Sequence, residues 1–121
     1  MKKRVLLVDD SKTAIMMQQA VLSTLQCEVS TAHDGLEAVA SATAARPDLI
    51  LMDVEMPNMD GFAACRRIRE KLGPSLPIIL VTTRDSPDYV RRGFESGCSG
   101  YLTKPVTSLD LLSKARIYLG V

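Results

Sequence analysis

Five polar residues directly follow short apolar runs of the sequence, and their side chains could bind a cation and an anion. Asp9 and Asp10 end the first run, and Asp53 ends a second one. Thr82 ends a third run, and Lys104 lies just beyond the last. Carboxylate oxygens are good ligands for Mg²⁺, whereas ammonium and hydroxyl groups bind anions. If the fold brings these residues together, they would form one site for both kinds of ion.

Each of these residues also has an ordinary structural explanation. Asp10 could cap a helix that starts at Ser11, and Asp53 could begin a turn. Thr82 could be a β-branched strand residue, and Lys104 an exposed loop lysine. As a set they are harder to explain in this way. Three ionised carboxylates that lie close together repel one another, and a divalent cation would relieve that repulsion.

A divalent cation, an ammonium group and a hydroxyl group are the components that phosphoryl transfer requires, because that reaction depends on positioning and charge neutralisation. Asp53 is the best candidate for the acceptor, since a carboxylate can act as a nucleophile and form an acyl phosphate. The sequence contains neither a P-loop nor a G-x-G-x-x-G motif. We therefore do not expect a nucleotide to be the direct donor.

An alternation of strand and helix patterns connects these positions. Strands are predicted at residues 5–8, 28–31, 49–52, 78–81 and 101–102. Helices are predicted at residues 11–25, 60–72, 86–96 and 107–118, with one more from Asp34 to just before Pro47. This order predicts an α/β fold in which five helices cover both faces of a five-stranded parallel sheet. Functional residues of such folds lie at the carboxyl ends of the strands.

The first predicted helix has an apolar face that should pack on the sheet. Residues at helical spacing along this face are Ala14, Met17, Val21, Leu22 and Leu25. Met16 and Met17 are interpreted as packing residues. The basic run at residues 66–69 is expected to be the solvated face of another helix.

Two short motifs concern helix ends. Asp34 and Glu37 have the spacing of a capping box, which predicts a helix start at Asp34. Gly93 and Gly97 form a GxxxG motif in a charged helix, which indicates close packing or helix termination.

Composition narrows the possible classes of protein. The chain has 121 residues, of which 46% are hydrophobic and 24% charged, with a net charge of +1. This size predicts a single domain, residues 1–121, and the charge gives no reason to expect nucleic-acid or membrane binding. His33 is the only histidine, so neither a histidine-rich metal site nor a catalytic triad is supported.

The N-terminal sequence and the cysteines favour a cytoplasmic location. No signal peptide is recognisable, because acids end the first apolar run after residues 5–8. The three cysteines are Cys27, Cys65 and Cys98. Their odd number and wide spacing fit reduced thiols, and the last two are expected to be small packing residues.

Four motifs in this order resemble the receiver domain of two-component response regulators over essentially the whole chain. They are VLLVDDS at 5–11, LILMDVEMPNMDG at 49–61, IILVTT at 78–83 and GYLTKP at 100–105. The resemblance implies a flavodoxin-like, doubly wound, three-layer fold with strand order 2-1-3-4-5, which is the order of the chemotaxis receiver. It also implies a phosphorylation-activated signalling switch rather than an enzyme.

The resemblance assigns roles to individual residues. Asp53 would accept the phosphoryl group, and Mg²⁺ would be held by Asp9, Asp10, Asp53 and the main-chain carbonyl of Glu55. Lys104 would pair with the phosphoryl group. Thr82 and Tyr101 would form the switch pair, in which the hydroxyl moves toward the phosphate and the aromatic ring turns inward to fill the space left. Tyr101 could also be an ordinary half-buried strand residue. Pro105 would follow Lys104 through a cis peptide bond.

This sequence departs from the family pattern near the expected site. Thr83 stands where a small residue is usual, so the phosphate pocket is expected to be tighter, and Val106 replaces a frequent phenylalanine. Glu55 and Arg84 would flank the mouth of the site. We hypothesise that they form an ion pair that slows hydrolysis of the acyl phosphate.

The resemblance also implies partners and leaves two other classes of function open. A sensor histidine kinase or phosphotransfer domain would donate the phosphoryl group, with Ala14, Ile15 and Gln18 as candidate recognition residues. A downstream protein would bind the face built from the fourth helix, fifth strand and fifth helix. The chain is expected to be a monomer or a weak phosphorylation-dependent dimer, and a stand-alone or excised receiver of chemotaxis-like type. The alternatives are an Mg²⁺-dependent aspartyl-phosphate hydrolase and a phosphorylation-independent binding module.

Overall fold

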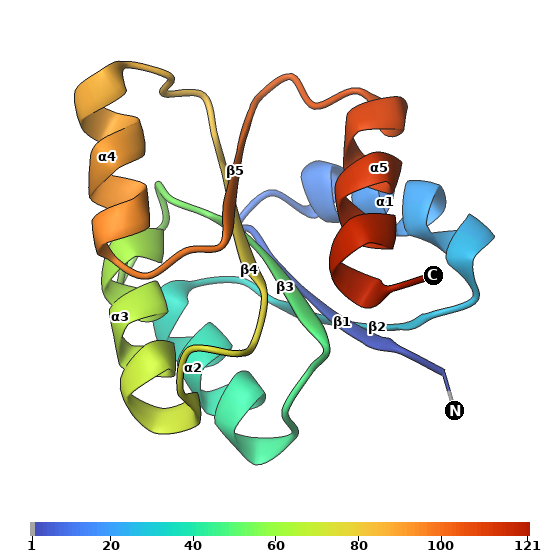
Figure 1. The fold of residues 1–121 in the computed structure, drawn as a ribbon, viewed down its shortest axis with the longest axis horizontal. Helices are drawn as coiled ribbons and strands as arrows, with labels where there is room; N and C mark the ends of the chain where they lie inside the picture. Colours follow the sequence, from blue (N-terminus) through green and yellow to red (C-terminus); the bar gives the residue numbers. More distant parts are fainter. Residues whose placement is uncertain (1) are drawn as a thin grey trace.

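Five parallel strands form the centre of the molecule (Figure 1), which is described for residues 2–121 by a computed structural model. The strands are β1 (Arg4–Val8), β2 (Glu28–Ala32), β3 (Leu49–Asp53), β4 (Ile78–Thr82) and β5 (Gly100–Thr103). The helices are α1 (Lys12–Leu22), α2 (Gly35–Ala44), α3 (Gly61–Leu72), α4 (Pro87–Glu95) and α5 (Ser108–Leu119), and a 3₁₀ turn, Ser23–Leu25, follows α1. The strand order is β2-β1-β3-β4-β5, which confirms the predicted doubly wound fold.

Two hydrophobic cores lie on opposite faces of the sheet, because side chains alternate along each strand. Leu6 and Val8 of β1 belong to the core beneath α2 and α3, whereas Val5 and Leu7 belong to the core beneath α1 and α5. All residues of β3 and β4 are buried. These two central strands therefore hold their carboxyl ends in fixed positions.

Side-chain caps define where each helix begins. Every α-helix is preceded by a residue whose side chain accepts a hydrogen bond from a backbone N–H of the first turn: Ser11, Asp34, Asp60, Ser86 and Thr107. The predicted capping box is only half present. Asp34 accepts from the N–H of Glu37, but the Glu37 carboxylate accepts from the N–H of His33 instead of Asp34.

The buried face of α1 differs from the prediction. Ile15 and Leu22 are the buried residues of this helix, whereas Met16 and Met17 are 67% and 65% exposed. The apolar residues of α1 spread over most of its circumference, so their spacing did not determine which side faces the sheet. The interpretation of Met16 and Met17 as packing residues was wrong. Ile15, being buried, is also unsuitable as a recognition residue.

Arg69 was expected to be solvated like the rest of the basic run at residues 66–69, but it is not. Its guanidinium is partly buried and donates hydrogen bonds to the carbonyl oxygens of Gly97, at 2.8 Å, and Gly73, at 3.2 Å. It also donates to the hydroxyl of Ser99 at 3.1 Å. Arg69 therefore ties the end of α3 to the loop between α4 and β5. Gly97 and Ser99 are distant in the sequence, and only the tertiary structure reveals these two acceptors.

The remaining structural expectations concern the cysteines and membrane spans. Cys65 and Cys98 are buried and all three cysteines are free thiols, although Cys98 lies in a loop rather than a helix. Within residues 2–121, no helix has the length and apolar character required to cross a bilayer.

Candidate functional site

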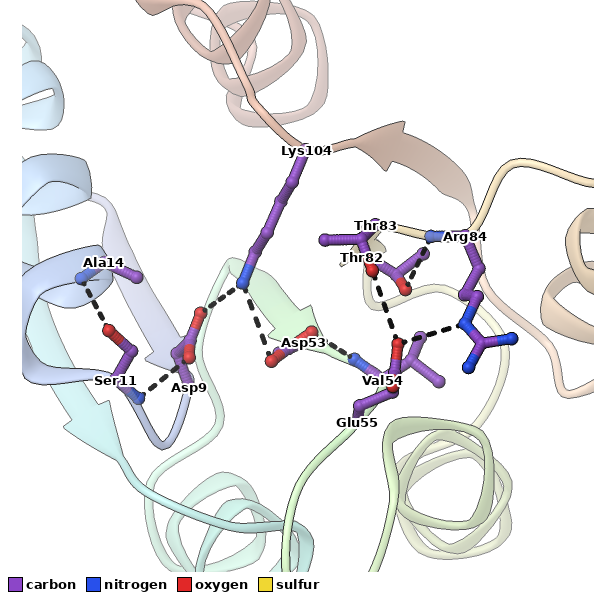
Figure 2. Close-up of polar contacts among 10 residues, drawn as sticks. All are labelled: Asp9, Ser11, Ala14, Asp53, Val54, Glu55, Thr82, Thr83, Arg84 and Lys104. Carbon is purple, nitrogen blue, oxygen red and sulfur yellow. Dashed lines mark hydrogen bonds and ion pairs between the residues drawn. The ribbon is translucent and has the colours of Figure 1, made fainter.

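The carboxyl ends of β1, β3, β4 and β5 meet at one edge of the sheet and bring the predicted residues together (Figure 2). β1 and β3 are neighbours in the sheet although β2 lies between them in the sequence. The chain therefore changes direction of winding at this point, which is where α/β folds generally bind ligands. Asp9 and Asp10 follow β1, and Asp53 is the last residue of β3.

Three carboxylates form an acidic cluster at this edge. One oxygen each from Asp9, Asp10 and Asp53 lie within 4.8 Å of one another. Asp9 is 1% exposed and Asp53 is 8% exposed, whereas Asp10 faces solvent. The cluster thus has a buried floor and an open side from which an ion or ligand could enter.

Backbone N–H groups orient the two buried carboxylates. Asp9 Oδ1 accepts a hydrogen bond from the N–H of Ser11 at 2.9 Å, and Asp53 Oδ1 accepts one from the N–H of Val54 at 2.8 Å. The other oxygen of each carboxylate, Oδ2, faces Lys104. The contributions of Ser11 and Val54 were not predicted from the sequence. The Asp-x-Ser spacing was a usable signal for Ser11, because aspartate commonly accepts from the N–H two residues ahead.

Lys104 reaches between the two buried acids (Figure 2). Its Nζ lies 3.0 Å from Asp9 Oδ2 and 3.6 Å from Asp53 Oδ2. Its backbone N–H donates to the carbonyl of Thr82 at 2.7 Å, and the Lys104–Pro105 peptide bond is cis. Burial alone would lower the pKa of Lys104, but its hydrogen bond to Asp9 and the charge of Asp53 raise it above the usual value. Lys104 is therefore a fixed positive charge.

Burial raises the pKa of Asp53, whereas burial by itself lowers that of Lys104. Desolvation raises the pKa of Asp53 to about 6, and the nearby charges of Asp9 and Asp10 contribute to the increase. Lys104 and the N–H of Val54 favour the ionised form but do not compensate fully. Burial thus makes the ionised form of Asp53 unfavourable even though the Lys104 ammonium lies 3.6 Å away.

The raised pKa of Asp53 predicts how the free energy of unfolding should depend on pH in the absence of divalent metal. The folded-state pKa of Asp53 lies above the value of an unfolded chain, so folding favours the protonated form. The resulting stability is fully present below about pH 4 and is lost as the pH rises through about 6. A difference of about two pKa units corresponds to at most about 3 kcal/mol.

We therefore expect Asp53→Asn to stabilise the metal-free protein by about 2–3 kcal/mol at pH 7.5 and by much less at pH 4. Urea unfolding in EDTA at both pH values would measure this difference. Addition of Mg²⁺ should stabilise the wild type more than the variant. A gain in stability that is equal at the two pH values would contradict the prediction.

The residues present fit a magnesium site. One oxygen from each of three carboxylates lies within 4.8 Å of the others, two of the three acids are buried, and the charges of Asp9 and Asp10 contribute to the raised pKa of Asp53. Mg²⁺ usually binds through one or a few carboxylates together with waters and phosphate oxygens.

The other predicted residues lie on the opposite side of Asp53. The Thr82 hydroxyl is buried and accepts a hydrogen bond from the N–H of Arg84 at 3.2 Å. Arg84 Nε lies 3.6 Å from Glu55 Oε1, and the hydroxyl of Thr83 lies 3.5 Å from the same oxygen (Figure 2). The hypothesised Glu55–Arg84 ion pair is therefore present. Thr83 belongs to this polar group.

Tyr101 contacts the same loop from β5. Its hydroxyl donates to the main-chain carbonyl of Arg84 at 2.7 Å. The hydroxyls of Thr82 and Tyr101 therefore hold the N–H and the carbonyl of one residue, Arg84. No direct hydrogen bond links the two hydroxyls within residues 2–121.

Comparisons with known proteins agree with this arrangement. The family model of the response regulator receiver domain matches residues 5–116. The chain is 40% identical over 117 residues to the response regulator PleD of Caulobacter vibrioides, covering 96% of this chain and 26% of PleD. It thus spans about a quarter of the length of that relative.

Two solved structures share the fold and add information on the site. The chemotaxis response regulator CheY4 of Vibrio cholerae superposes with a TM-score of 0.91 at 38% identity, covering 98% of this chain and 100% of CheY4. The receiver domain of the sensor histidine kinase PA1611 from Pseudomonas aeruginosa PAO1 does so with a TM-score of 0.91 at 32% identity, with both chains fully covered at 100%. That structure has a magnesium ion coordinated in its active site cleft.

These matches define the class of the protein as a flavodoxin-like, CheY-like domain. The chain belongs to the response regulator receiver domain family of two-component systems. Receiver domains bind Mg²⁺ in an acidic pocket and interact with histidine kinases or phosphotransfer proteins. The family thus accounts for the acidic cluster at the ends of β1 and β3.

Proposed function

We propose that Asp53 accepts a phosphoryl group from a phosphohistidine or a small acyl phosphate, and that this modification switches the domain between two states. The observation that carries the proposal is the position of Asp53. Its carboxylate ends a fully buried strand, shares a cluster with Asp9 and Asp10, and lies 3.6 Å from the Lys104 ammonium. A carboxylate so positioned can act as a nucleophile toward phosphorus.

The transfer forms one bond and breaks one. A bond forms between an Asp53 carboxylate oxygen and phosphorus, while the P–N bond of a phosphohistidine or the P–O bond of an acyl phosphate breaks. The leaving group departs with the electron pair. Lys104, held at 3.0 Å from Asp9, can pair with a phosphoryl oxygen without a large change of position.

Asp9, Asp10 and Asp53 would hold Mg²⁺, with the main-chain carbonyl of Glu55 as the remaining protein ligand. When bound, Mg²⁺ supplies positive charge that offsets the carboxylates and the phosphoryl oxygens. The protein orients Asp9 and Asp53 for this purpose through the N–H groups of Ser11 and Val54. We infer that the domain promotes only its own phosphorylation and dephosphorylation.

The test is Mg²⁺-dependent labelling by acetyl phosphate, followed by intact mass spectrometry and by release of phosphate. The proposal predicts one phosphoryl group per chain, accumulation of the labelled form, and loss of labelling in EDTA. Continuous release of phosphate without accumulation would indicate an aspartyl-phosphate hydrolase. Absence of labelling would indicate a phosphorylation-independent binding module.

The phosphodonor protein is proposed to bind beside α1. A groove of about 640 Å³ lies between α1 and the loop that connects β5 to α5, and Lys104 and Thr83 line its end nearest the site. Ala14, Met17 and Gln18 contribute to its α1 wall. An apolar groove that continues into the phosphoryl site suits a helix carrying a phosphohistidine. Ala14 and Gln18 thus remain candidate recognition residues, and Met17 joins them in place of Ile15.

The output is proposed to arise at Arg84. A phosphoryl oxygen that accepts a hydrogen bond from Thr82 would draw its hydroxyl toward Asp53 and so disturb the contact of that hydroxyl with the N–H of Arg84. The carbonyl of Arg84 is held by Tyr101, so the loop after β4 links both residues of the switch pair. Phosphorylation can shift the population of the two states only by binding one of them more strongly. The face formed by α4, β5 and α5 would differ between the states and so control a downstream protein.

We expect Arg84→Ala to accelerate dephosphorylation. Arg84 and Glu55 are 62% and 50% exposed, and their ion pair lies at the mouth of the site, where it would hinder an attacking water. An exposed pair contributes about 0.5–1 kcal/mol, which corresponds to about a 2- to 5-fold faster loss of label.

Arg91→Ala is the matched control for this experiment. Arg91 is also an exposed arginine, and its ion pair with Asp88 lies within α4, away from Glu55. The half-life of the labelled protein after removal of donor would be compared for both variants. An unchanged or slower loss of label in Arg84→Ala would contradict a protective role for the pair.

A further inference from the structure

Gly93 lies directly against the ring of Tyr101. It is a buried residue of α4, and β5 lies beside this helix at the edge of the sheet (Figure 1). A Cβ atom on Gly93 would lie 3.0 and 3.1 Å from two ring carbons of Tyr101, and 3.4 Å from a methyl group of Leu80. The absence of a side chain at Gly93 therefore creates the space that the edge of the ring occupies.

The backbone gives no reason for glycine at this position. Gly97, the other glycine of the GxxxG motif, has a φ of +102° and needs the conformational freedom of glycine. Gly93 lies inside α4 and is not among the residues with positive φ. Glycine within a helix is less favourable than alanine by about 1 kcal/mol. Contact with the Tyr101 ring is the feature of the structure that explains it.

The ring position that Gly93 permits is the one that contacts the loop after β4. With its ring against Gly93, Tyr101 donates its hydroxyl hydrogen to the Arg84 carbonyl at 2.7 Å. Desolvation raises the pKa of Tyr101 to about 12, in keeping with a ring covered on one side. Arg84 in turn pairs with Glu55 at the mouth of the site.

We propose that Gly93 is a positioning residue of the switch. It sets the balance between two positions of the Tyr101 ring, because it leaves open the space that the hydrogen-bonded position occupies. This proposal rests on the proposed role of Asp53 phosphorylation. A methyl group at Gly93 requires a neighbour to move by a few tenths of an ångström. Leu80 is fully buried in β4, whereas Tyr101 is partly exposed, so we expect the Tyr101 ring to move and its hydrogen bond to the Arg84 carbonyl to weaken.

A double-mutant cycle tests the contact itself. In a Tyr101→Ala background, Gly93→Ala should raise the Tm by about 3–5 °C, as for an ordinary glycine inside a helix. In the wild-type and Tyr101→Phe backgrounds, which keep the ring, this rise should be absent or reversed. An equal rise in all three backgrounds would overturn the proposal.

A spectroscopic readout distinguishes positioning from a general loss of stability. In protein labelled with 3-fluorotyrosine, Gly93→Ala should shift the ¹⁹F resonance of Tyr101, assigned with Tyr101→Phe, and leave that of Tyr118 in place. Tyr118 donates to the carbonyl of Ser99 and packs in the opposite core, so it serves as an internal control. An unchanged Tyr101 resonance would overturn the proposal.

Binding of beryllofluoride, an analogue of the phosphoryl group, tests the consequence for the switch. The ring position against Gly93 is the inward one, which the implied switch adopts when the Thr82 hydroxyl moves toward the phosphoryl group. Loss of this position in Gly93→Ala should therefore weaken beryllofluoride binding about 2- to 5-fold. Unchanged or tighter binding would overturn the proposal. Labelling of wild-type protein by acetyl phosphate is measured in parallel, because its absence would refute phosphorylation of Asp53 itself rather than the role of Gly93.

Discussion

Replacing Asp53 with asparagine is expected to reduce Mg²⁺-dependent labelling by acetyl phosphate by at least about 100-fold. The amide of asparagine is a poor nucleophile and cannot form the acyl phosphate. The other carboxylates cannot replace it, because Asp9 is engaged by Lys104 at 3.0 Å and by the N–H of Ser11, and Asp10 is exposed to solvent. Intact mass spectrometry after incubation with excess donor would measure the loss.

Asp85→Asn provides a control for this variant. Asp85 is an exposed acid in the loop after β4, and it lies outside the cluster of Asp9, Asp10 and Asp53. Its replacement should leave labelling at the wild-type level. The expected increase in the stability of Asp53→Asn in EDTA would show in the same preparation that the variant is folded. Labelling of Asp53→Asn at more than about a tenth of the wild-type rate would place the acceptor elsewhere.

The residues at the strand ends were predictable because two simple patterns coincide there. Continuous apolar runs identify strands buried on both faces, and the first polar residue after each run must lie at the edge of the sheet. The positions of Asp9, Asp53 and Thr82 at the carboxyl ends of strands were predicted in this way. The strand order came from the resemblance to receiver domains, and Lys104 needed that order to be placed beside β1 and β3.

Features that depend on the contact of two distant segments were not predictable in this way. The orientation of α1 could not be derived, because Ile15 and Met17 differ by about 200° around the helix and both are apolar. Arg69 appeared in the sequence as one of several basic residues, whereas two of its acceptors, Gly97 and Ser99, lie far along the chain in the loop before β5. The space beside Gly93 that the Tyr101 ring occupies depends on the distance between α4 and β5, which no sequence pattern specifies.

Gly61 is the position where a single methyl group should damage both the fold and the site. A Cβ atom on Gly61 would lie 2.3 Å from the carbonyl oxygen of Asp53 and 2.8 Å from the Cα of Val54. Both are backbone atoms, and the N–H of Gly61 already donates to the Val54 carbonyl at 2.8 Å. The end of β3 and the start of α3 are therefore in direct backbone contact, and neither can shift without moving Asp53.

We expect Gly61→Ala to destabilise the protein by at least about 3 kcal/mol, because the backbone at the end of β3 must be displaced. The same displacement moves the Asp53 carboxylate, so labelling by acetyl phosphate of the fraction that remains folded should fall by about 10-fold or more. Urea unfolding and labelling at low temperature would measure the two effects separately.

Gly73→Ala is the matched control, since it adds the same methyl group where space is open. Nothing lies within 4 Å of a Cβ at Gly73, and its φ of +83° and ψ of −173° impose backbone strain of about 1–3 kcal/mol. This variant should lose some stability and label at the wild-type rate. If Gly61→Ala proved no less stable than Gly73→Ala and labelled normally, the contact between Gly61 and Asp53 would not be what positions the phosphoacceptor. The expected difference in labelling follows from steric contact with the end of β3, because both substitutions add the same atoms and only the one at Gly61 meets the backbone of Asp53.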